Sequence, residues 1–564
     1  MLRSKPPPLT FFSLRQSSTA SNDTPRSSSN RMTTSRRLKT SKKHTILMVS
    51  DFFYPRLGGV EMHIWSLSQC LLSQGHKVVV LTRQYDDRRG VRWMTNGLKV
   101  YYLPALIMGD AVALPTNLFN FPMFRQIVIR EGITIVHAHQ ATAMMGHACM
   151  FHAGTMGIPC VYTDHSLFSF NELLPILLHI FSVFSLQGAS HCIAVSHTCR
   201  ENLCMRAHLQ PNTVSTIPNA IDPKLFVPDM SRRGDGLTVD ERVNIVILSR
   251  LVYRKGIHIA VRVIPRICAK YPNAYFIIGG DGDKKLMVLE MIEQHRLFDR
   301  VEILGAIKHS DVRSVLTRGH IFLNCSLTES FCIAILEAAC CGLHVVSTNV
   351  GGVPEVLPPD DITYAAAATP DAVEMALDTV MRRVRNLPSP WEVHQRICGC
   401  YSWHSVARRT VKVYDHVSAM PMLGVRSRLA KYWHAMQWHF RLAVIWIVMT
   451  DWLWYGLLCW LWPEKSIEKA RNLDIVKWMR KGGGVRGEGD GNGNGDGDGG
   501  KKSGKKEGGG AGGSSSSGSS SSSSSSCSSA GIGSGAGGGV RSASAHNMGG
   551  ESDDWMIGGG VEME

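Results

Sequence analysis

The feature that most constrains the fold is a repeated alternation of short apolar runs, glycine-bearing turns and helical patterns. Residues 45–50 have the pattern of a buried strand, and the turn that follows contains Gly58 and Gly59. A helical pattern then extends to Leu72, and a second buried strand covers residues 78–82. Strand, glycine turn, helix and strand make a βαβ unit, which predicts two parallel strands joined by a helix.

The alternation continues and then begins again in the second half of the chain. Further strands are expected at residues 133–137, 160–165 and 191–196, and a second series at 243–248, 275–279, 301–304, 321–324 and 345–348. The loop-rich, polar stretch between the two series predicts a linker at 221–242. We therefore expect an α/β protein with two Rossmann-like, doubly wound domains, 44–220 and 243–420, facing a cleft.

The composition argues against a nucleic-acid-binding protein. The net charge is +15, but residues 1–43 hold ten Lys or Arg against the single acid Asp23 and supply +9 of it. The remaining +6 is spread over the rest of the chain. The 15 cysteines include no CxxC pair and no zinc-like spacing, so reduced, mostly buried thiols in a cytosol-facing protein are expected.

Both ends of the chain have the composition of segments without a core. Residues 1–43 are rich in Ser, Thr, Arg and Pro, which is typical of a disordered basic tail and also of an organellar transit peptide. Residues 482–564 consist largely of Gly, Ser, Asp and Lys and predict a second disordered tail.

Charged side chains follow two strands of the second series. Arg250 and Lys255 come after the strand 243–248, and Glu329 and Glu337 come after the strand 321–324 in the stretch 326–342. Because ligands bind at the carboxyl ends of parallel strands, these groups are expected in one cleft. Two cations and a helix N-terminus would neutralise a diphosphate, and carboxylates suit sugar hydroxyls.

Other candidates are less specific. His165 follows a predicted strand of the first domain, and Gly58–Gly59 would let a ligand approach the backbone closely. The pair is not part of a GxGxxG motif, which disfavours a dinucleotide. Asp281-Gly-Asp283 is suited to a magnesium ion, but a glycine turn after a strand explains it equally well.

Several of these motifs occur in the order and spacing of one family. They are Gly58-Gly59-x-Glu61, Asp164-His165-Ser166, Ser249-Arg250-Leu251 with Arg254-Lys255-Gly256, and Glu329-x7-Glu337. Together they resemble the GT-B glycosyltransferases of the family-4 type. Longer stretches, such as 50–55, 98–104 and 319–324, are similar to the phosphatidylinositol N-acetylglucosaminyltransferases, which start the synthesis of glycosylphosphatidylinositol (GPI) anchors. The resemblance covers about residues 44–470.

The resemblance implies a reaction. N-acetylglucosamine (GlcNAc) would pass from UDP-GlcNAc to phosphatidylinositol, with retention at the anomeric carbon. Arg250 and Lys255 would bind the diphosphate, Glu337 the ribose and Glu329 the hydroxyls of the donor sugar. As UDP-GlcNAc is a substrate and the family fold works without a bound metal, no cofactor and no metal are expected.

The resemblance also assigns roles around these four side chains. The backbone at Ser330 and Phe331 would donate to phosphate or sugar, and Gly58 and Gly59 would let the donor lie against the first loop. His165 would contact the sugar near the reacting carbon. The family further implies partner subunits, membrane phosphatidylinositol as the acceptor, and an endoplasmic reticulum location with the catalytic domain in the cytosol.

A membrane segment is predicted near the end of the folded part. Residues 442–462 form an apolar run of 21 residues, long enough to cross a bilayer once. Asp451 lies near its centre and is a candidate contact to a partner subunit, because an unpaired acid is costly in lipid. The alternative is an interfacial or tilted helix that tolerates a protonated acid. Basic residues flank both ends, so the charge pattern does not give the orientation that the family implies.

Two other functions remain open from the sequence. One is another lipid glycosyltransferase of the same fold, such as a plastid sulfolipid synthase, which the basic N-terminus suggests. The other is a non-catalytic GT-B subunit that only binds a nucleotide sugar, against which the complete set of Arg250, Lys255, Glu329 and Glu337 argues.

Overall fold

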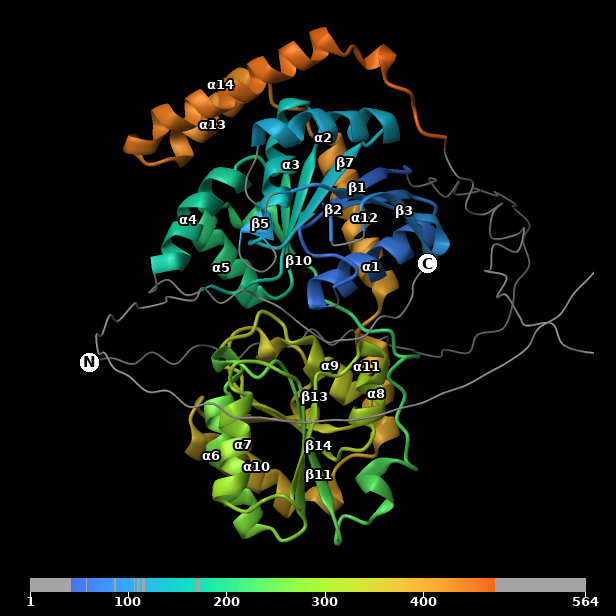
Figure 1. The fold of residues 1–564 in the computed structure, drawn as a ribbon, viewed down its shortest axis with the longest axis vertical. Helices are drawn as coiled ribbons and strands as arrows, with labels where there is room; N and C mark the ends of the chain where they lie inside the picture. The colour runs from blue at the N-terminus through green and yellow to red at the C-terminus, as the bar shows by residue number, and fades with distance from the viewer. Residues whose placement is uncertain are drawn as a thin grey trace, which may run out of the picture. The chain divides into compact units, whose positions relative to one another are not determined.

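The computed structural model describes residues 42–471, apart from 57, 86–87, 106, 109–111, 114–116 and 169–172. All but the last two residues of the predicted basic segment 1–43, and the whole predicted tail 482–564, lie outside the described residues. Two parallel α/β halves make up the described part, so the predicted fold class is confirmed (Figure 1).

The first half is built on an eight-stranded sheet in the order β10-β9-β8-β7-β1-β2-β4-β3. Its neighbouring strands are parallel except for β3, which runs antiparallel to β4 at the edge. The strands are β1 (Thr45–Val49), β2 (Lys77–Arg83), β3 (Gly90–Met94), β4 (Leu98–Leu103), β7 (Ile135–His139), β8 (Cys160–Asp164), β9 (His191–Ala194) and β10 (Val214–Thr216). Between β4 and β7, β5 (Ile107–Met108) and β6 (Val112–Ala113) form a separate small pair.

Helices connect these strands in the expected βαβ manner. They are α1 (Gly59–Ser73), α2 (Asn117–Glu131), α3 (Met144–Thr155), α4 (Leu173–Leu186) and α5 (His197–Ala207). The central strands are buried at nearly every position because helices cover both faces of the sheet. In β1, for example, the four residues from Ile46 to Val49 are completely buried.

The second half carries a six-stranded, entirely parallel sheet in the order β13-β12-β11-β14-β15-β16. Its strands are β11 (Val243–Leu248), β12 (Ala274–Gly279), β13 (Val301–Gly305), β14 (Ile321–Asn324), β15 (His344–Thr348) and β16 (Ile362–Ala365). Its helices are α6 (Ile257–Lys270), α7 (Lys285–Gln294), α8 (His309–Leu316), α9 (Ile333–Cys340), α10 (Pro370–Arg382) and α11 (Pro390–Cys400).

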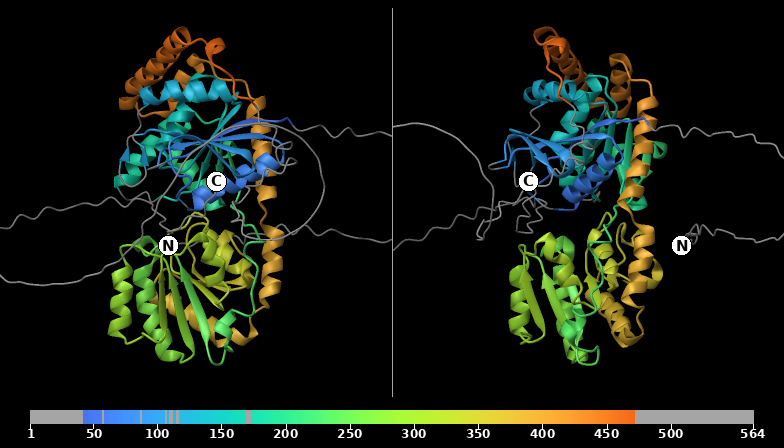
Figure 2. Two further views of the ribbon diagram at one scale, coloured as in Figure 1. Left: turned by 45° about the vertical axis from the view of Figure 1, so that its right-hand side comes forward. Right: turned by 90° about the vertical axis from the view of Figure 1, so that its right-hand side faces the viewer.

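The helix α12 (Trp403–Ala419) returns to the first half, so the predicted limit of the second domain at residue 420 is wrong for this segment. Figure 2 shows the chain passing from one half to the other at this point. Val406, Tyr414 and Val417 belong to the apolar cluster that contains Ile46 and Val80 of the first sheet. An amphipathic pattern shows that a helix covers a core, but it does not show which of two cores it covers.

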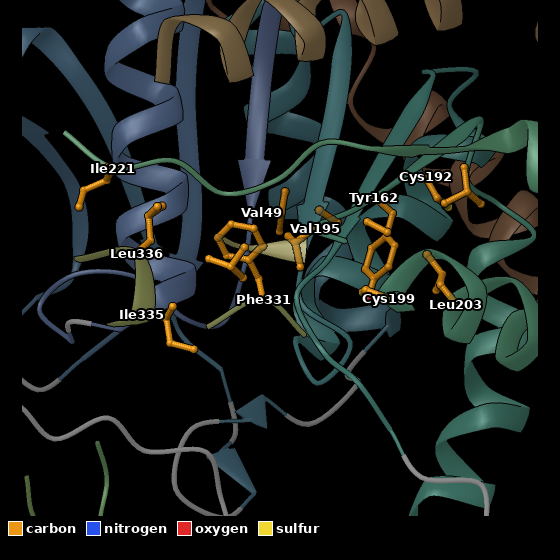
Figure 3. Close-up of a cluster of buried hydrophobic side chains, with 14 of the residues drawn as sticks. Val49, Tyr162, Cys192, Val195, Cys199, Leu203, Ile221, Phe331, Ile335 and Leu336 are labelled. Atoms are coloured by element: carbon orange, nitrogen blue, oxygen red, sulfur yellow. The ribbon is translucent and has the colours of Figure 1, made fainter. Parts of the chain in front are cut away.

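The two halves also share apolar packing beside the sheet ends. Phe331, Ile335 and Leu336 of the second half lie in the same buried cluster as Val49 and Val195 of the first (Figure 3). Phe331 is only 2% exposed. The helix α9 is therefore fixed against both sheets, which places its N-terminal end at the junction between the halves.

Two further helices, α13 (Val425–Ala435) and α14 (Trp438–Leu461), pack on α2, α3 and α4 of the first half (Figure 1). Among the described residues, α14 is the one helix long and apolar enough to cross a membrane. The sequence indicated Asp451 of α14 as a candidate contact to another subunit, but its partners lie within the same chain. Asp451 is 2% exposed and bonds within the chain to His152 and Thr155 of α3.

Candidate functional site

A cleft of about 260 Å³ lies where the carboxyl ends of the two sheets meet. Its walls come from loops that follow β1 and β8 in the first half and β11, β12 and β14 in the second. It is lined by every residue that the sequence assigned to the site: Gly58, Gly59, His165, Arg250, Lys255, Glu329, Ser330, Phe331 and Glu337. Residues more than 250 positions apart in the chain thus share one cavity.

An ion pair between Lys255 and Glu329 lies at the wall formed by the second half. Lys255 Nζ is 2.6 Å from Glu329 Oε1, and Ser326 Oγ donates to the same oxygen at 2.8 Å. Burial alone would raise the pKa of Glu329, but the Lys255 cation and the two hydrogen bonds hold it below its usual value. Glu329 is therefore an anion at neutral pH, ready to accept hydrogen bonds from a ligand.

Gly256 allows Lys255 to approach the end of β14. It adopts a left-handed backbone conformation with φ of +70°, and a Cβ atom there would lie 1.9 Å from the Cys325 carbonyl oxygen. Only glycine fits this position without displacing the backbone. Arg250, two residues after β11, lines the same part of the cleft.

The Asp281-Gly-Asp283 turn follows β12 and is open to solvent. Asp281 Oδ1 lies 3.6 Å from Lys285 Nζ, and Asp283 Oδ2 lies 3.0 Å from Lys284 Nζ. Both carboxylates are about half exposed, at 47% and 50%. Each acid therefore faces a lysine, although Asp281 also lines the cleft.

The loop that carries Glu329 and Ser330 is fastened to both halves. Ser330 Oγ donates to the His165 carbonyl oxygen at 2.6 Å, across the junction between the halves. On its other side, Gly352 N donates to the Glu329 carbonyl oxygen at 2.9 Å. Gly351 has φ of +53°, and a Cβ atom there would lie 2.1 Å from that oxygen. Tight packing of Gly351–Gly352 against this loop was not foreseen from the sequence.

The ring of His165 lies in a cluster of buried histidines. His139 Nδ1 and His165 Nε2 are 3.4 Å apart, and the rings of His63 and His165 meet edge to face at 4.7 Å. Burial lowers the pKa of His63 to about 4 and that of His165 well below its usual value, so these rings are neutral at physiological pH. His63 Nδ1 is further held by Asn219 Oδ1 at 2.8 Å.

Sequence reasoning missed His63, His139 and Asn219. The only signal was position: His139 ends β7, next to β8, and His63 lies in the first turns of α1 behind Gly58–Gly59. In the part of the chain that the structure describes, two groups have spacings suited to a metal, His63/His139/His165 and Cys340/His394/Cys398. Neither group includes Asp281 or Asp283, the pair that the sequence raised for magnesium.

Glu337 lies on α9 at the far side of the cleft from the histidines of the first half. Its Oε1 is 3.6 Å from His309 Nε2 at the start of α8, and its side chain is 14% exposed. The neighbouring carboxylate raises the pKa of His309. Glu337 also lines the cleft, so its carboxylate is within the cavity that holds the Lys255–Glu329 pair.

A carboxylate of the second half also closes the N-terminus of α5 in the first half. Glu355 accepts hydrogen bonds from His197 N at 2.6 Å, from Thr198 N at 2.9 Å and from Thr198 Oγ1 at 2.9 Å. An anion at a helix N-terminus is stabilised by the unpaired N–H groups there. Glu355 therefore links the two halves beside the cleft, a role that no local pattern indicated.

Comparison with known families identifies both halves. A family model described as PIGA (GPI anchor biosynthesis) matches residues 83–172, and one described as Glycosyl transferases group 1 matches residues 232–386. The chain is 48% identical over 390 residues to a human phosphatidylinositol N-acetylglucosaminyltransferase subunit, a match that covers 69% of this chain and 79% of the human protein. The Arabidopsis thaliana protein of the same name is 47% identical, covering 78% of this chain and 98% of its own length.

Solved structures support the fold. Sucrose-phosphate synthase from Thermosynechococcus elongatus matches with a TM-score of 0.56 at 18% identity, over 67% of this chain and all of that protein. The pneumococcal O-GlcNAc transferase GtfA, solved with UDP and GlcNAc, matches with a TM-score of 0.51 at 12% identity, over 67% and 100% of the two chains. At these identities the likeness shows the GT-B architecture alone. Taken with the close relatives, it leads to one conclusion: the chain is a glycosyltransferase of GPI-anchor biosynthesis and belongs to the PIGA family of phosphatidylinositol N-acetylglucosaminyltransferase subunits.

Proposed function

We propose that this protein transfers GlcNAc from UDP-GlcNAc to phosphatidylinositol, with retention of configuration at the anomeric carbon. The observation that carries the proposal is the buried Lys255–Glu329 pair in the cleft, tied through Ser330 to His165 of the opposite half. A cation, an anion and a neutral imidazole are thereby fixed around one cavity. The printed names of the relatives, phosphatidylinositol N-acetylglucosaminyltransferase, support the same transferred sugar and acceptor.

The diphosphate of the donor would bind at the wall formed by the second half. Arg250 and Lys255 line this wall and supply positive charge. Ile333 and Ala334 at the N-terminus of α9 also line the cleft, and the N–H groups of a helix N-terminus suit a phosphate. Because these groups neutralise a departing diphosphate, we propose that the reaction needs no metal ion.

The sugar and the nucleoside would bind on either side of the diphosphate. Glu329, an anion at neutral pH, would accept hydrogen bonds from the sugar hydroxyls, with backbone donors at Ser330 and Phe331 beside it. Glu337 on α9 would accept from the ribose hydroxyls. Gly58 and Gly59 leave room for the donor against the loop after β1, because neither presents a side chain to the cavity.

The chemical step exchanges one C–O bond for another on the same face of the sugar. The bond between the anomeric carbon and the phosphate oxygen breaks as an inositol hydroxyl oxygen attacks that carbon. The hydroxyl proton passes to the departing phosphate oxygen, so UDP leaves carrying it. His165 is neutral at physiological pH and would stabilise the reacting sugar as a hydrogen-bonding group rather than as a charge.

The proposed acceptor also indicates where in the cell the protein acts. Phosphatidylinositol is a membrane lipid, and we propose that the catalytic halves meet it at the cytosolic face of the endoplasmic reticulum. The relatives are named as subunits, which supports partner proteins for this chain as well. The single-pass arrangement expected from the sequence would hold the chain at the membrane, and so would a helix that lies in the membrane surface.

The test is a microsomal assay with labelled UDP-GlcNAc. We expect Lys255→Ala and Glu329→Ala to lower the yield of GlcNAc-phosphatidylinositol at least about 100-fold, the size expected when a preorganised charge is removed. Lys284→Ala, which removes an equal charge outside the cleft, serves as the matched control and should keep the wild-type rate. Wild-type rates in both cleft variants would disprove the site.

A reversed pair separates catalysis from folding. Lys255→Glu combined with Glu329→Lys preserves opposite charges across the 2.6 Å contact but exchanges their places. We expect this double variant to reach wild-type protein levels and still to make no product. A mutant that regained activity would show that the pair only stabilises the fold.

A further inference from the structure

Two helices of the second half bring together side chains that suit a metal ion. His394 and Cys398 lie four positions apart on α11, and Cys340 is the last residue of α9. Side chains at this spacing in a helix point to the same side. The two sulfur atoms and one ring nitrogen of the histidine lie within 4.8 Å of one another. We call these three residues the Cys340 cluster.

The imidazole ring of the cluster is held from one side. His394 Nδ1 lies 2.7 Å from the Cys340 carbonyl oxygen. Because a carbonyl oxygen only accepts, this contact places the proton of a neutral ring on Nδ1 and leaves the lone pair on Nε2. Cys398 Sγ is 3.3 Å from Nε2. Histidines that bind metals are commonly held in this way, with one ring nitrogen donating to a carbonyl and the other turned to the ion.

Capping of α9 explains only part of this arrangement. The Cys340 carbonyl belongs to the last turn of α9, where carbonyl groups lack helical partners, so a donor there is stabilising by itself. Capping does not account for the two sulfur atoms beside the ring. Cys340 Sγ lies 3.5 Å from His394 Nδ1, and Cys398 Sγ lies 3.3 Å from Nε2. Two thiols that converge on one imidazole are a ligand set for a metal.

The distances fit a tetrahedral ion. With Zn–S bonds of about 2.3 Å and Zn–N bonds of about 2.0–2.1 Å, neighbouring ligand atoms of a tetrahedral zinc site lie ~3.5–3.8 Å apart. The contact between Cys398 Sγ and His394 Nε2 is already close to this spacing. Cys340 Sγ lies on the Nδ1 side of the ring and would turn toward Nε2, which rotation about its Cα–Cβ bond allows.

The ligand types select the metal. Thiolate and imidazole suit Zn²⁺, whereas Mg²⁺ and Ca²⁺ take oxygen ligands. Cys340 is completely buried, and His394 and Cys398 are half-buried, so one side of the cluster is within reach of solvent. On binding, two S–Zn bonds and one N–Zn bond would form, and the two thiols would release their protons to water.

The cluster lies outside the reaction site but on one of its helices. None of its three residues is among those that line the cleft. Glu337, which does line the cleft, precedes Cys340 on α9 by three residues, about one helical turn. The two helices also pack tightly beside the cluster, since a Cβ atom on Gly342 would lie 2.4 Å from Pro390 Cβ at the start of α11. The ligands are therefore carried on elements that already hold each other.

We propose that Cys340, His394 and Cys398 bind one zinc ion, which fastens α11 to the C-terminal end of α9, with a water molecule as the fourth ligand. The spacing of 54 positions between Cys340 and His394 is too long for any zinc pattern in the sequence, so only the fold reveals the site. The ion has a structural role and takes no part in the transfer reaction. The proposal can therefore be tested apart from the proposed function.

The first test measures metal content. The full chain is purified in detergent without a metal-binding tag, and its zinc is measured by mass spectrometry. We expect one zinc ion per wild-type chain and loss of that ion in Cys398→Ser and His394→Gln. Glutamine keeps an N–H donor for the Cys340 carbonyl but offers no imidazole, so it separates capping from metal binding. The matched control is Cys400→Ser, an exposed thiol on the same helix, which should keep the ion.

Two outcomes of this test would overturn the proposal. One is a zinc content of Cys398→Ser equal to that of the wild type, because the ion would then be bound elsewhere. The other is a wild-type chain that holds no zinc even after titration with Zn²⁺. Alkylation of thiols in intact microsomes is a separate check. A disulfide between Cys340 and Cys398 found there would also overturn the proposal, since a thiol in a disulfide cannot bind zinc.

The second test uses Co²⁺ as a probe of the ligand set. In a tetrahedral site with thiolate ligands, Co²⁺ absorbs visible light strongly, and added Zn²⁺ displaces it. We expect this absorption when Co²⁺ is added to the zinc-free wild-type chain, and an affinity at least about 100-fold lower in Cys340→Ser. His394→Cys keeps three ligands and should bind Co²⁺ with stronger sulfur-to-metal absorption. Identical spectra and affinities in the wild type and Cys340→Ser would refute the assignment.

Discussion

The buried ion pair between Asp164 and Arg206 offers the sharpest test of how His165 is held. Both side chains are completely buried, and Arg206 Nη2 donates to Asp164 Oδ2. Asp164 Oδ1 also accepts from Ser166 N and from the Tyr162 hydroxyl, both at 3.2 Å. Asp164 directly precedes His165, so the pair fixes the end of β8 from which the histidine enters the cleft.

Each single substitution leaves a buried group without its partner. Arg206→Met leaves the carboxylate with two neutral donors, and Asp164→Asn leaves a buried guanidinium without an anion. Breaking a buried pair in this way costs about 3–5 kcal/mol of unfolding free energy, whereas replacing both partners removes the uncompensated charge. We therefore expect the double variant to lose no more than either single variant, which corresponds to a coupling of at least about 3 kcal/mol.

The measurement is the urea midpoint of the full chain in membranes, followed by pulse proteolysis, for the wild type, the two singles and the double. The matched control is the exposed pair Arg266–Asp371, whose side chains are 45% and 81% exposed. Its coupling should stay below about 1 kcal/mol. If the double variant loses as much unfolding free energy as the two single variants together, the view that Asp164 and Arg206 act as one unit is refuted.

Three further outcomes follow from the geometry around the cleft. Glu355→Gln should lower the free energy of unfolding by about 1 kcal/mol and raise the KM for UDP-GlcNAc, because it weakens the cap that joins the two halves. The control is Glu392→Gln in the capping box of α11, which should lower the free energy of unfolding by a similar amount without changing the KM. Gly351→Ala should lower kcat at least about tenfold, since its Cβ would displace the Glu329 backbone, whereas Gly399→Ala has open space and should leave kcat unchanged. His63 has a pKa lowered to about 4, so its stabilising effect is complete above pH 6.5 and declines as the pH falls, because only the unfolded chain then binds the proton. At pH 5 the unfolding free energy lost through His63 is about 2 kcal/mol. The drop in unfolding free energy between pH 7 and pH 5, measured from urea midpoints, should therefore be about 2 kcal/mol smaller in His63→Gln than in the wild type.

Local sequence patterns predicted most of the sheet architecture. Strand β11 and strand β14 have the predicted bounds, 243–248 and 321–324, because a parallel strand covered on both faces is a continuous apolar run between polar turns. The exposed antiparallel strand β3 was not predicted. It lies at the sheet edge, where the residues 90–93 remain exposed and leave no apolar run to recognise.

The candidate site could be predicted as far as its residues follow strands. Arg250, Lys255 and Glu329 come directly after strands of one sheet, and parallel order brings such positions to one edge. His63 and Glu355 could not be found in this way, because their partners are distant in the chain. Asn219 is 156 positions from His63, and Thr198 is 157 positions from Glu355.

The sequence by itself determined the two α/β halves, the strand-end positions of the charged groups and the presence of one long apolar helix. These properties depend on periodicity and on turn residues, which are local. Only the tertiary structure decided that α12 covers the first core and that Asp451 is paired with His152 rather than with another protein. The physical reason is the same in both cases. An amphipathic pattern specifies that a face must be buried, while the surface that buries it is chosen by packing and hydrogen bonding between distant parts of the chain.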